Sequence, residues 1–183
     1  MIINLVTQNP NKIKEFKLIL EPEIEVKPLR VEYPELRSDD NVEIVKMAAK
    51  MLAEKFGMKI VVEDSGLFIE ALNGFPGTCT AYICKKIGNK GILRLMEGVE
   101  NRRCWYRCAI GYCEPNENPI AFEGEEEGII TLEEKGKGGW GEDPIFIPTG
   151  ETKTYGELRK DNDINLFRKR ALERLKGHLL ENQ

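Results

Sequence analysis

Histidine is almost missing from this sequence, in which His178 is the single one among 183 residues. Catalysis that depends on a histidine base is therefore disfavoured. Cysteine is odd in number: five are present, and Cys104, Cys108 and Cys113 fit no zinc-binding spacing. We expect these thiols to be buried in strands, rather than joined in a disulfide framework or bound to a metal.

Long apolar runs are absent as well. No stretch reaches the roughly 18 apolar residues of a membrane span, and Met1 to Val6 is a short apolar run without a basic leader. We therefore expect a soluble, cytoplasmic protein with no membrane partner.

Positive charge is not in excess. The chain has 27 Lys and Arg residues against 31 Asp and Glu residues, for a formal net charge of -4. Because there is no overall basic field, a nucleic-acid-binding module is disfavoured, and we expect no nucleic acid partner. A polyanionic ligand would need a local cluster of positive groups or a bound metal ion.

The chain contains enough hydrophobic residues to form one hydrophobic core. With 183 residues, of which 41% are hydrophobic, we expect a single domain over residues 1–183. Apolar spacing in the first third alternates strands with helices, which indicates an α/β domain. The predicted elements are strands at Ile2–Val6, Glu23–Leu29 and Ile60–Val62, and helices at Pro10–Leu20 and Val42–Phe56.

The remainder of the chain adds strands that predict an antiparallel portion of the sheet. The predicted elements are helices at Ala81–Ile87, Lys90–Met96 and Asn165–Leu180, and strands at Arg103–Cys113, Ile120–Phe122, Gly128–Leu132 and Ile145–Ile147. We interpret the acidic triplet between Gly124 and Gly128 as a solvated turn.

A polar turn, Thr7-Gln8-Asn9-Pro10-Asn11-Lys12, separates the first strand from the first helix. Backbone N–H groups and the helix dipole favour phosphate at such a turn, and Lys12 and Lys14 add positive charge. The turn lacks the glycines of a P-loop. An ordinary helix cap with exposed lysines is therefore the alternative interpretation.

Two carboxylates, Glu63 and Asp64, follow a short apolar strand, and Ser65 and Gly66 come next, where the glycine is interpreted as permitting a tight turn. Ligands of α/β sheets bind at the carboxyl ends of strands. Paired carboxylates there suit a hard cation such as Mg²⁺ and the removal of a proton from water. A solvated turn is the alternative. Glu35 would complete a metal site only if the fold brings it to Asp64, and on its own it is interpreted as a surface carboxylate.

The glycine-rich segment from Gly138 to Pro144 places Trp140 close to Asp143. An indole can stack on a base and an aspartate can orient a ligand, although a buried tryptophan in a turn is the alternative. Basic residues of the final helix, Arg168 among them, offer a phosphate ligand. A solvated basic face explains most of those residues equally well.

Taken in order, these segments resemble the inosine triphosphate pyrophosphatase family, which removes non-standard purine nucleotides. The TxNxxK motif of that family is matched by Thr7, Asn9 and Lys12. The resemblance spans nearly the whole chain. Its further segments are Pro34-Glu35, Glu63 to Leu67, Ala71 to Gly77, Gly139 to Phe146, Thr154 to Leu158 and Arg168 to Ala171.

The resemblance implies a two-lobed α/β fold, with a long mixed β-sheet, flanking helices and a substrate cleft between the lobes, and a homodimer. It also implies Mg²⁺-dependent hydrolysis of ITP, dITP or XTP to the monophosphate and pyrophosphate. By the same resemblance Glu35 and Asp64 hold the metal, and Asp64 accepts the proton of the attacking water. The residues implied to contact the triphosphate are Thr7, Gln8, Asn9, Pro10, Asn11, Lys12 and Ser65. Those implied to surround the base are Trp140, Gly141, Glu142 and Asp143, with Phe167 and Arg168 in the last helix.

Several positions depart from the family pattern. Glycine, alanine and an aromatic residue of the family are replaced here by Gln8, Gly156 and Glu142. The family's Lys and Ser-His-Arg pattern is met by Asn165-Leu166-Phe167-Arg168, so Phe167 stands where the base-reading histidine is expected. Lys160 is a candidate to replace the missing lysine. Losing a polar base contact favours altered or broader base choice.

Two alternative functions stay open. One is a pyrophosphatase of the same fold with broader or different base specificity, for example towards a modified pyrimidine triphosphate. The other is a nucleotide-binding protein that has lost catalysis. Retention of Glu35, Asp64 and Lys12 argues against the second, because a binder that does no chemistry has less need of a metal-held water.

Overall fold

The computed structural model describes residues 1–160 and 163–182 of the chain. They fall into two compact units. Unit 1 consists of Met1–Asp64, Cys108–Gly124 and Leu166–Gln183, and unit 2 of Ser65–Arg107 and Glu125–Asn165. The two units are described separately, and the expected single domain over residues 1–183 stays a prediction.

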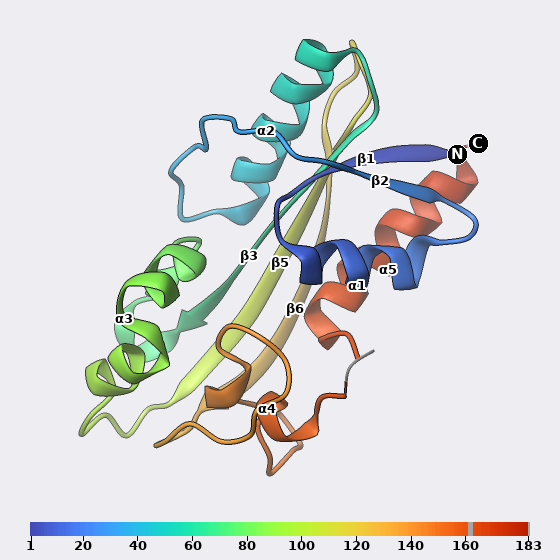
Figure 1. Cartoon of the computed structure of the whole chain (residues 1–183). Helices are drawn as coiled ribbons and strands as arrows, with labels where there is room; N and C mark the ends of the chain where they lie inside the picture. The colour runs from blue at the N-terminus through green and yellow to red at the C-terminus, as the bar shows by residue number, and fades with distance from the viewer. Residues whose placement is uncertain (161–162, 183) are drawn as a thin grey trace. The chain divides into compact units, whose positions relative to one another are not determined.

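The strands form one mixed sheet, which confirms the predicted α/β fold with flanking helices (Figure 1). Its strands are β1 (Ile2–Val6), β2 (Glu25–Leu29), β3 (Ile60–Ile69), β4 (Pro76–Gly77), β5 (Arg103–Cys113), β6 (Ile120–Ile130) and β7 (Phe146–Pro148). The order is β2-β1-β3-β5-β6-β7, with β4 paired to β3. Strand β1 is parallel to β2 and β3, whereas the β3–β4 and β6–β7 pairs are antiparallel.

Unit 1 contains the helices α1 (Pro10–Leu20), α2 (Asn41–Phe56) and α5 (Leu166–Glu181). Their ends follow from local chemistry. Asn9 caps α1 by accepting a hydrogen bond from the backbone N–H of Asn11, and Pro10 occupies the first turn, where its missing N–H costs nothing. Asp40 caps α2 in the same way, and Gly57 ends it in the left-handed region at φ 65°.

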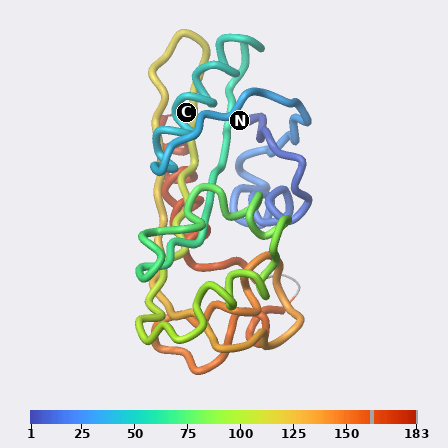
Figure 2. Tube along the Cα trace, turned by 90° about the vertical axis from the view of Figure 1, so that its left-hand side faces the viewer, coloured from blue at the N-terminus to red at the C-terminus, as the bar shows by residue number. Residues whose placement is uncertain are grey.

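One apolar core cluster of unit 1 lies between α2 and the sheet. Val45, Ala49 and Leu52 of α2 are fully buried and pack with residues of β3 and with Ala109 and Cys113 of β5. Figures 1 and 2 both show α2 lying beside the turn that joins β5 to β6. Helices α1 and α5 pack against each other.

Unit 2 contains α3 (Thr80–Leu95), α4 (Tyr155–Leu158) and two short 3-10 helices, η1 (Glu70–Leu72) and η2 (Asp143–Ile145). Helix α3 is interrupted at Gly88, which agrees with the two predicted helices on either side of it. An aromatic row forms part of the core, with the ring of Phe146 4.5 Å from that of Tyr106 and 5.6 Å from that of Tyr155. The short helix α4 was not predicted.

The predicted tight turn after Asp64 is wrong, because β3 continues without interruption to Ile69. Gly66 is inside the strand for a different reason. A Cβ atom at Gly66 would lie 2.0 Å from the carbonyl oxygen of Gly77. Gly77 is part of β4, which pairs with β3. Glycine is required there by the close approach of two backbones. The carboxylates of Glu63 and Asp64 therefore project from the middle of a long strand.

The predicted solvated turn at the acidic triplet is also wrong, because β6 runs through it as one strand. Its side chains alternate, with Glu125 and Glu127 exposed and Glu126 buried. The two exposed carboxylates pair with arginines of β5: Arg107 Nε lies 2.6 Å from Glu125 Oε2, and Arg103 Nη2 3.0 Å from Glu127 Oε1. Such cross-strand pairs favour a continuous strand over a turn.

The cysteine prediction is confirmed for the strand residues: Cys104, Cys108 and Cys113 are buried in β5, and all five cysteines are free. Within residues 1–160 and 163–182, no helix has the length and apolar content needed to cross a membrane.

Candidate functional site

The turn before α1 is ordered by its own side chains. Thr7 Oγ1 accepts a hydrogen bond from the backbone N–H of Asn9 at 3.1 Å, and Asn9 Oδ1 accepts from that of Asn11 at 2.9 Å. Gln8 and Asn11 are exposed. The helix cap considered as an alternative is therefore present, and the positive end of the α1 dipole lies at this turn.

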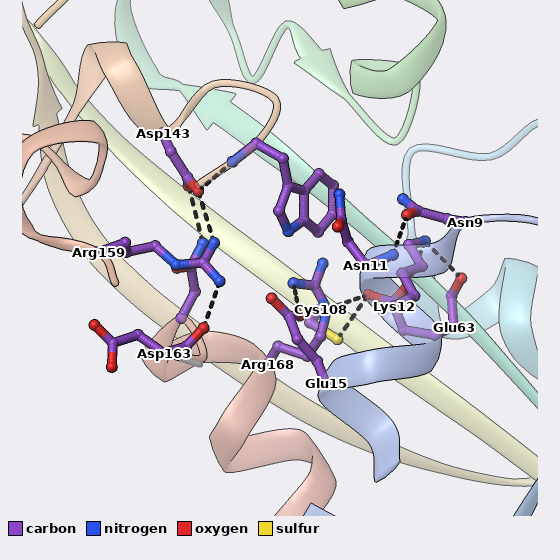
Figure 3. A network of polar contacts seen from close by, with 12 residues as sticks. Asn9, Asn11, Lys12, Glu15, Glu63, Cys108, Asp143, Arg159, Asp163 and Arg168 are labelled. Carbon is purple, nitrogen blue, oxygen red and sulfur yellow. Dashed lines mark hydrogen bonds and ion pairs between the residues drawn. The ribbon is translucent and has the colours of Figure 1, made fainter. Parts of the chain in front are cut away.

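Lys12 ties this turn to β3. Its ammonium group donates to the carbonyl oxygen of Glu63 at 3.3 Å and forms an ion pair with Glu63 Oε2 (Figure 3). The fold thus brings two motifs together that lie far apart in the sequence, one around residues 7–12 and the other at Glu63 and Asp64.

Glu63 is the centre of a buried ionic network. Its Oε1 accepts from Arg168 Nε at 3.1 Å and from the thiol of Cys108 at 3.2 Å. Arg168 in turn donates to Glu15 Oε2 at 2.8 Å, and its side chain is only 1% exposed. Although burial opposes ionisation, Lys12 and Arg168 hold the pKa of Glu63 down at about 2. Glu63 is a structural anion with both oxygens engaged.

Asp64, the next residue, behaves in the opposite way. It is half-buried, and its Oδ2 accepts a hydrogen bond from Asn41 Nδ2 at 2.5 Å. Burial raises the pKa of Asp64 to about 6, with further contributions from the negative charges of Glu63 and Glu35 and opposition from Lys12. Neighbouring carboxylates whose pKa values are pushed apart mark an acid–base site.

The carboxylate oxygens of Asp64 and Glu35 are of the kind that Mg²⁺ prefers, but they would supply only part of its coordination shell. In the part of the chain that the structure describes, no group of three or more His, Cys, Asp or Glu side chains is placed to hold a metal ion. Glu63 is taken up by Lys12 and Arg168. The exposed carboxylate of Glu35 contributes to the raised pKa of Asp64, although burial is the larger cause. Mg²⁺ in nucleotide enzymes commonly takes one or two carboxylates, with water and phosphate oxygens as the rest.

Asp143 is the centre of a second buried cluster, in unit 2. Its Oδ2 accepts from the backbone N–H of Trp140 at 2.9 Å and from Arg159 Nη1 at 2.7 Å (Figure 3). Its Oδ1 accepts from Asn165 Nδ2 at 3.0 Å. Asp143 is 1% exposed, so the carboxylate organises the loop around Trp140.

Gly139 leaves the space that this carboxylate needs, which gives a first prediction. A Cβ atom at Gly139 would lie 2.0 Å from Asp143 Oδ2, and the residue has φ +70°. Gly141 has φ +66° but nothing within 4 Å of an added Cβ. We expect Gly139→Ala to lower the free energy of unfolding by about 3 kcal/mol or more, and the control Gly141→Ala by about 1 kcal/mol, the ordinary cost of a left-handed alanine. Equal losses in urea titrations would contradict the role given to the carboxylate.

Glu142 lies beside this cluster and is also buried, with 5% exposure. Burial raises the pKa of Glu142 to about 7, against the opposing effect of hydrogen bonds from Cys84 and Tyr106, and with a contribution from the charge of Asp143. Glu142 replaces the aromatic residue of the family pattern, so a titrating group stands where a ring is expected.

This shift predicts a pH-dependent stability. A carboxyl group with a raised folded-state pKa stabilises the fold fully below about pH 4.5, and this contribution is lost as pH rises through about 7. The shift corresponds to roughly 3 kcal/mol. We expect Glu142→Gln to gain stability relative to the wild type by about that amount between pH 4 and pH 8, measured by urea unfolding. Parallel pH curves for the two proteins would contradict the assignment.

The remaining predicted residues lie in different surroundings. Trp140 is half-buried, Gly141 is exposed, and Ser65 is half-buried directly after Asp64 in β3. Lys160 is exposed, and its backbone N–H donates to Asp163 Oδ2 at 2.8 Å. Phe167 is 2% exposed, and the Arg168 guanidinium lies 4.9 Å from its ring centre. Their contacts with a nucleotide stay predictions.

Five residues of the two clusters were not predicted as site residues. Asn41 and Arg159 hold Asp64 and Asp143, and Glu15, Cys108 and Asn165 complete the networks. A weak signal exists for Asn41, which follows the helix-capping Asp40. Glu15 occupies a buried position on α1, although it is charged, and a charged residue on the apolar face of a helix is a usable signal of pairing.

Comparison with known proteins identifies relatives over nearly the full chain. A model of the Ham1 family matches residues 3–178. A dITP/XTP pyrophosphatase of Methanopyrus kandleri is 48% identical over 176 residues, which cover 95% of this chain and 94% of that protein. A dITP/XTP pyrophosphatase of Thermococcus kodakarensis is 40% identical over 184 residues, covering 100% of this chain and 99% of that protein.

Solved structures agree with these sequence matches. A HAM1 protein from Coxiella burnetii superposes with a TM-score of 0.87 at 30% identity and covers 99% of both chains. The Ham1 protein of Staphylococcus aureus gives a TM-score of 0.86 at 25% identity and covers 100% of both chains.

Proposed function

The chain belongs to the Ham1 family, and we propose that it hydrolyses the non-standard purine nucleoside triphosphates ITP, dITP and XTP to monophosphate and pyrophosphate. It is a nucleoside triphosphate pyrophosphatase, a hydrolase of acid anhydride bonds, as the resemblance implied. The names of its relatives support dITP and XTP as substrates.

The observation that carries the proposal is the arrangement of Glu63 and Asp64. Glu63 is fully buried in ion pairs with Lys12 and Arg168, whereas the neighbouring Asp64 is half-buried and its Oδ2 accepts a hydrogen bond from Asn41. A carboxylate held in this way is suited to take a proton from water. The capped amino end of α1 and Lys12 supply positive potential beside it, which suits a triphosphate.

We propose that Glu35 and Asp64 hold Mg²⁺, as the resemblance implies and as their oxygen donors allow. When bound, a divalent cation offsets the negative charge of the phosphate oxygens and lowers the pKa of a coordinated water. Asn41 donates a hydrogen bond to Oδ2 of Asp64, which fixes the plane of the carboxylate. Asp64 then accepts the proton as water attacks the α-phosphorus. The bond between the α-phosphorus and the oxygen that bridges it to the β-phosphorus breaks. That oxygen leaves with pyrophosphate, and no covalent intermediate with the protein forms.

The other chain contacts follow the resemblance. The triphosphate contacts are proposed for Thr7, Gln8, Asn9, Pro10, Asn11, Lys12 and Ser65, and the base contacts for Trp140, Gly141, Glu142, Asp143, Lys160, Phe167 and Arg168. Lys12 has two of its three donors on Glu63, so one is left for phosphate. We also propose a cytoplasmic homodimer that binds no nucleic acid.

The test is pyrophosphate release from ITP, XTP, dITP, ATP, GTP and dUTP, with Mg²⁺ and with a chelator. We expect selective release from ITP, XTP and dITP that needs the metal. Release from ATP or dUTP at comparable rates would replace the proposal with the broader pyrophosphatase. Binding of these nucleotides without release would replace it with the non-catalytic protein.

Broader base choice is a second candidate because of one observation. Phe167, at the position of the family's base-reading histidine, is 2% exposed, and its phenyl side chain has no N–H or O–H group. A site that rejects wrong bases needs buried polar groups that only the right base satisfies. Base selection in this chain must therefore come from another residue, or it is relaxed.

A further inference from the structure

The cluster around Asp143 contains a buried acceptor that the proposed mechanism does not use. Asn165 is 3% exposed, and its Oδ1 is buried without a hydrogen-bond partner among the residues that the structure describes. Buried polar atoms in native proteins are almost always paired, and an exception calls for a ligand or an ordered water.

The orientation of this amide is fixed by its surroundings. Asn165 Nδ2 donates to Asp143 Oδ1 at 3.0 Å, and the reversed amide would place two oxygens against each other. Asp143 is itself held by the Trp140 N–H and by Arg159. The Asn165 side chain therefore presents Oδ1 as an acceptor, and the partner that completes it must bring a donor.

Helix capping does not account for this oxygen. Asn165 immediately precedes α5, where an asparagine usually accepts a hydrogen bond from a backbone N–H of the first turn. No such bond is made by Oδ1 within residues 163–182. Leu166 on one side of Asn165 is exposed and Ile164 on the other is half-buried, so the segment lies near the surface while the Asn165 side chain is turned inward.

We propose that Asn165 is a specificity-determining residue, whose Oδ1 accepts a hydrogen bond from the N1–H of a 6-oxopurine base. This inference rests on the proposed function. Hypoxanthine and xanthine present N–H at N1, whereas adenine presents a lone pair there, which would face Oδ1 and leave both acceptors unpaired. Guanine also has an N1–H. Asn165 therefore separates 6-oxopurines from adenine and does not by itself exclude guanine.

The test is equilibrium binding of IMP, 1-methyl-IMP and AMP by calorimetry. The wild type is expected to bind IMP about tenfold to a hundredfold more tightly than 1-methyl-IMP or AMP, because a buried acceptor left unpaired weakens binding by that factor. In Asn165→Ala, affinity for IMP falls to the level of 1-methyl-IMP and AMP. The matched control is Asn101→Ala, an asparagine of the same unit whose Nδ2 donates to Glu70 Oε2 at 2.7 Å at an exposed position. The control is expected to keep the preference.

Two results would overturn the inference. One is equal binding of IMP and 1-methyl-IMP by the wild type, a comparison that needs no variant to fold. The other is an equal loss of affinity for all three nucleotides in Asn165→Ala, which indicates that Asn165 only supports Asp143. Because monophosphate binding needs no turnover, a protein that prefers IMP but releases no pyrophosphate from ITP refutes the proposed function and leaves this inference standing.

Discussion

Asp64→Asn is expected to lower kcat for ITP by a factor of about 10³ or more. The amide keeps the shape of the carboxylate but neither accepts a proton from water nor holds Mg²⁺ with a charge, and loss of a general base alone costs on the order of 10²–10⁴ in rate. The measurement is pyrophosphate release at saturating ITP and Mg²⁺.

Stability separates this loss of chemistry from loss of the fold. Burial raises the pKa of Asp64 to about 6, so its charged form is disfavoured in the folded protein. Its raised pKa means that its stabilising contribution is lost as pH rises through about 6. At pH 8 without metal, Asp64→Asn is therefore expected to unfold at an equal or higher urea concentration than the wild type. An inactive variant that is also destabilised would count against the assignment, as would a variant with wild-type kcat.

Arg168→Met is expected to lower the free energy of unfolding by about 3–5 kcal/mol at pH 7. Arg168 bridges Glu63 and Glu15, and the side chains of all three are at most 4% exposed. Removing one partner of a buried ion pair leaves an uncompensated charge, and this cost is larger than the net contribution of the intact pair. Urea unfolding of the metal-free protein measures it.

Lys169→Met is the matched control on the same helix. The Lys169 side chain is 48% exposed and lies 3.8 Å from Glu173, so its loss is expected to change stability by less than about 0.5 kcal/mol.

The depressed pKa of Glu63 stabilises the wild type above about pH 4.5, and this contribution is lost as pH falls towards 2. The gap between wild type and Arg168→Met should therefore narrow from pH 7 to pH 3. A gap that is small at pH 7, or that widens in acid, would contradict the network.

Much of the local structure was predictable because its signals are local. Helix α1 has its predicted bounds, since Asn9 and Pro10 mark its beginning. The alternation of strands and helices gave the α/β class, which the mixed sheet confirms. Glu63 and Asp64 were expected at the end of a short strand, whereas the structure places both inside the longer strand β3.

The errors occurred where distant contacts decide local structure. A glycine after two carboxylates suggests a turn, but Gly66 lies against the backbone carbonyl of Gly77 in β4, and no local pattern shows that approach. The charges of Glu125 and Glu127 suggest a solvated turn until the arginines of β5 are placed beside them. Tertiary pairing overrides local preference at both positions.

Residue spacing in the sequence also could not predict which residues contact Asp64 and Glu63. Asp64 is held by Asn41, and Glu63 by Arg168, which is 105 residues further along the chain. The number of residues between two positions does not tell how close they lie in the folded chain when that number is so large. The role of Arg168 illustrates the consequence: the resemblance suggests a substrate contact, and the structure shows its guanidinium engaged with Glu15 and Glu63.

Hydrolysis of ITP in ¹⁸O-labelled water, with both products analysed by mass spectrometry, tests the central claim most directly. Attack of an Asp64-activated water on the α-phosphorus predicts one ¹⁸O atom in IMP and none in pyrophosphate, with no labelled product from Asp64→Asn. Label in pyrophosphate, or formation of IDP and inorganic phosphate, would contradict the account.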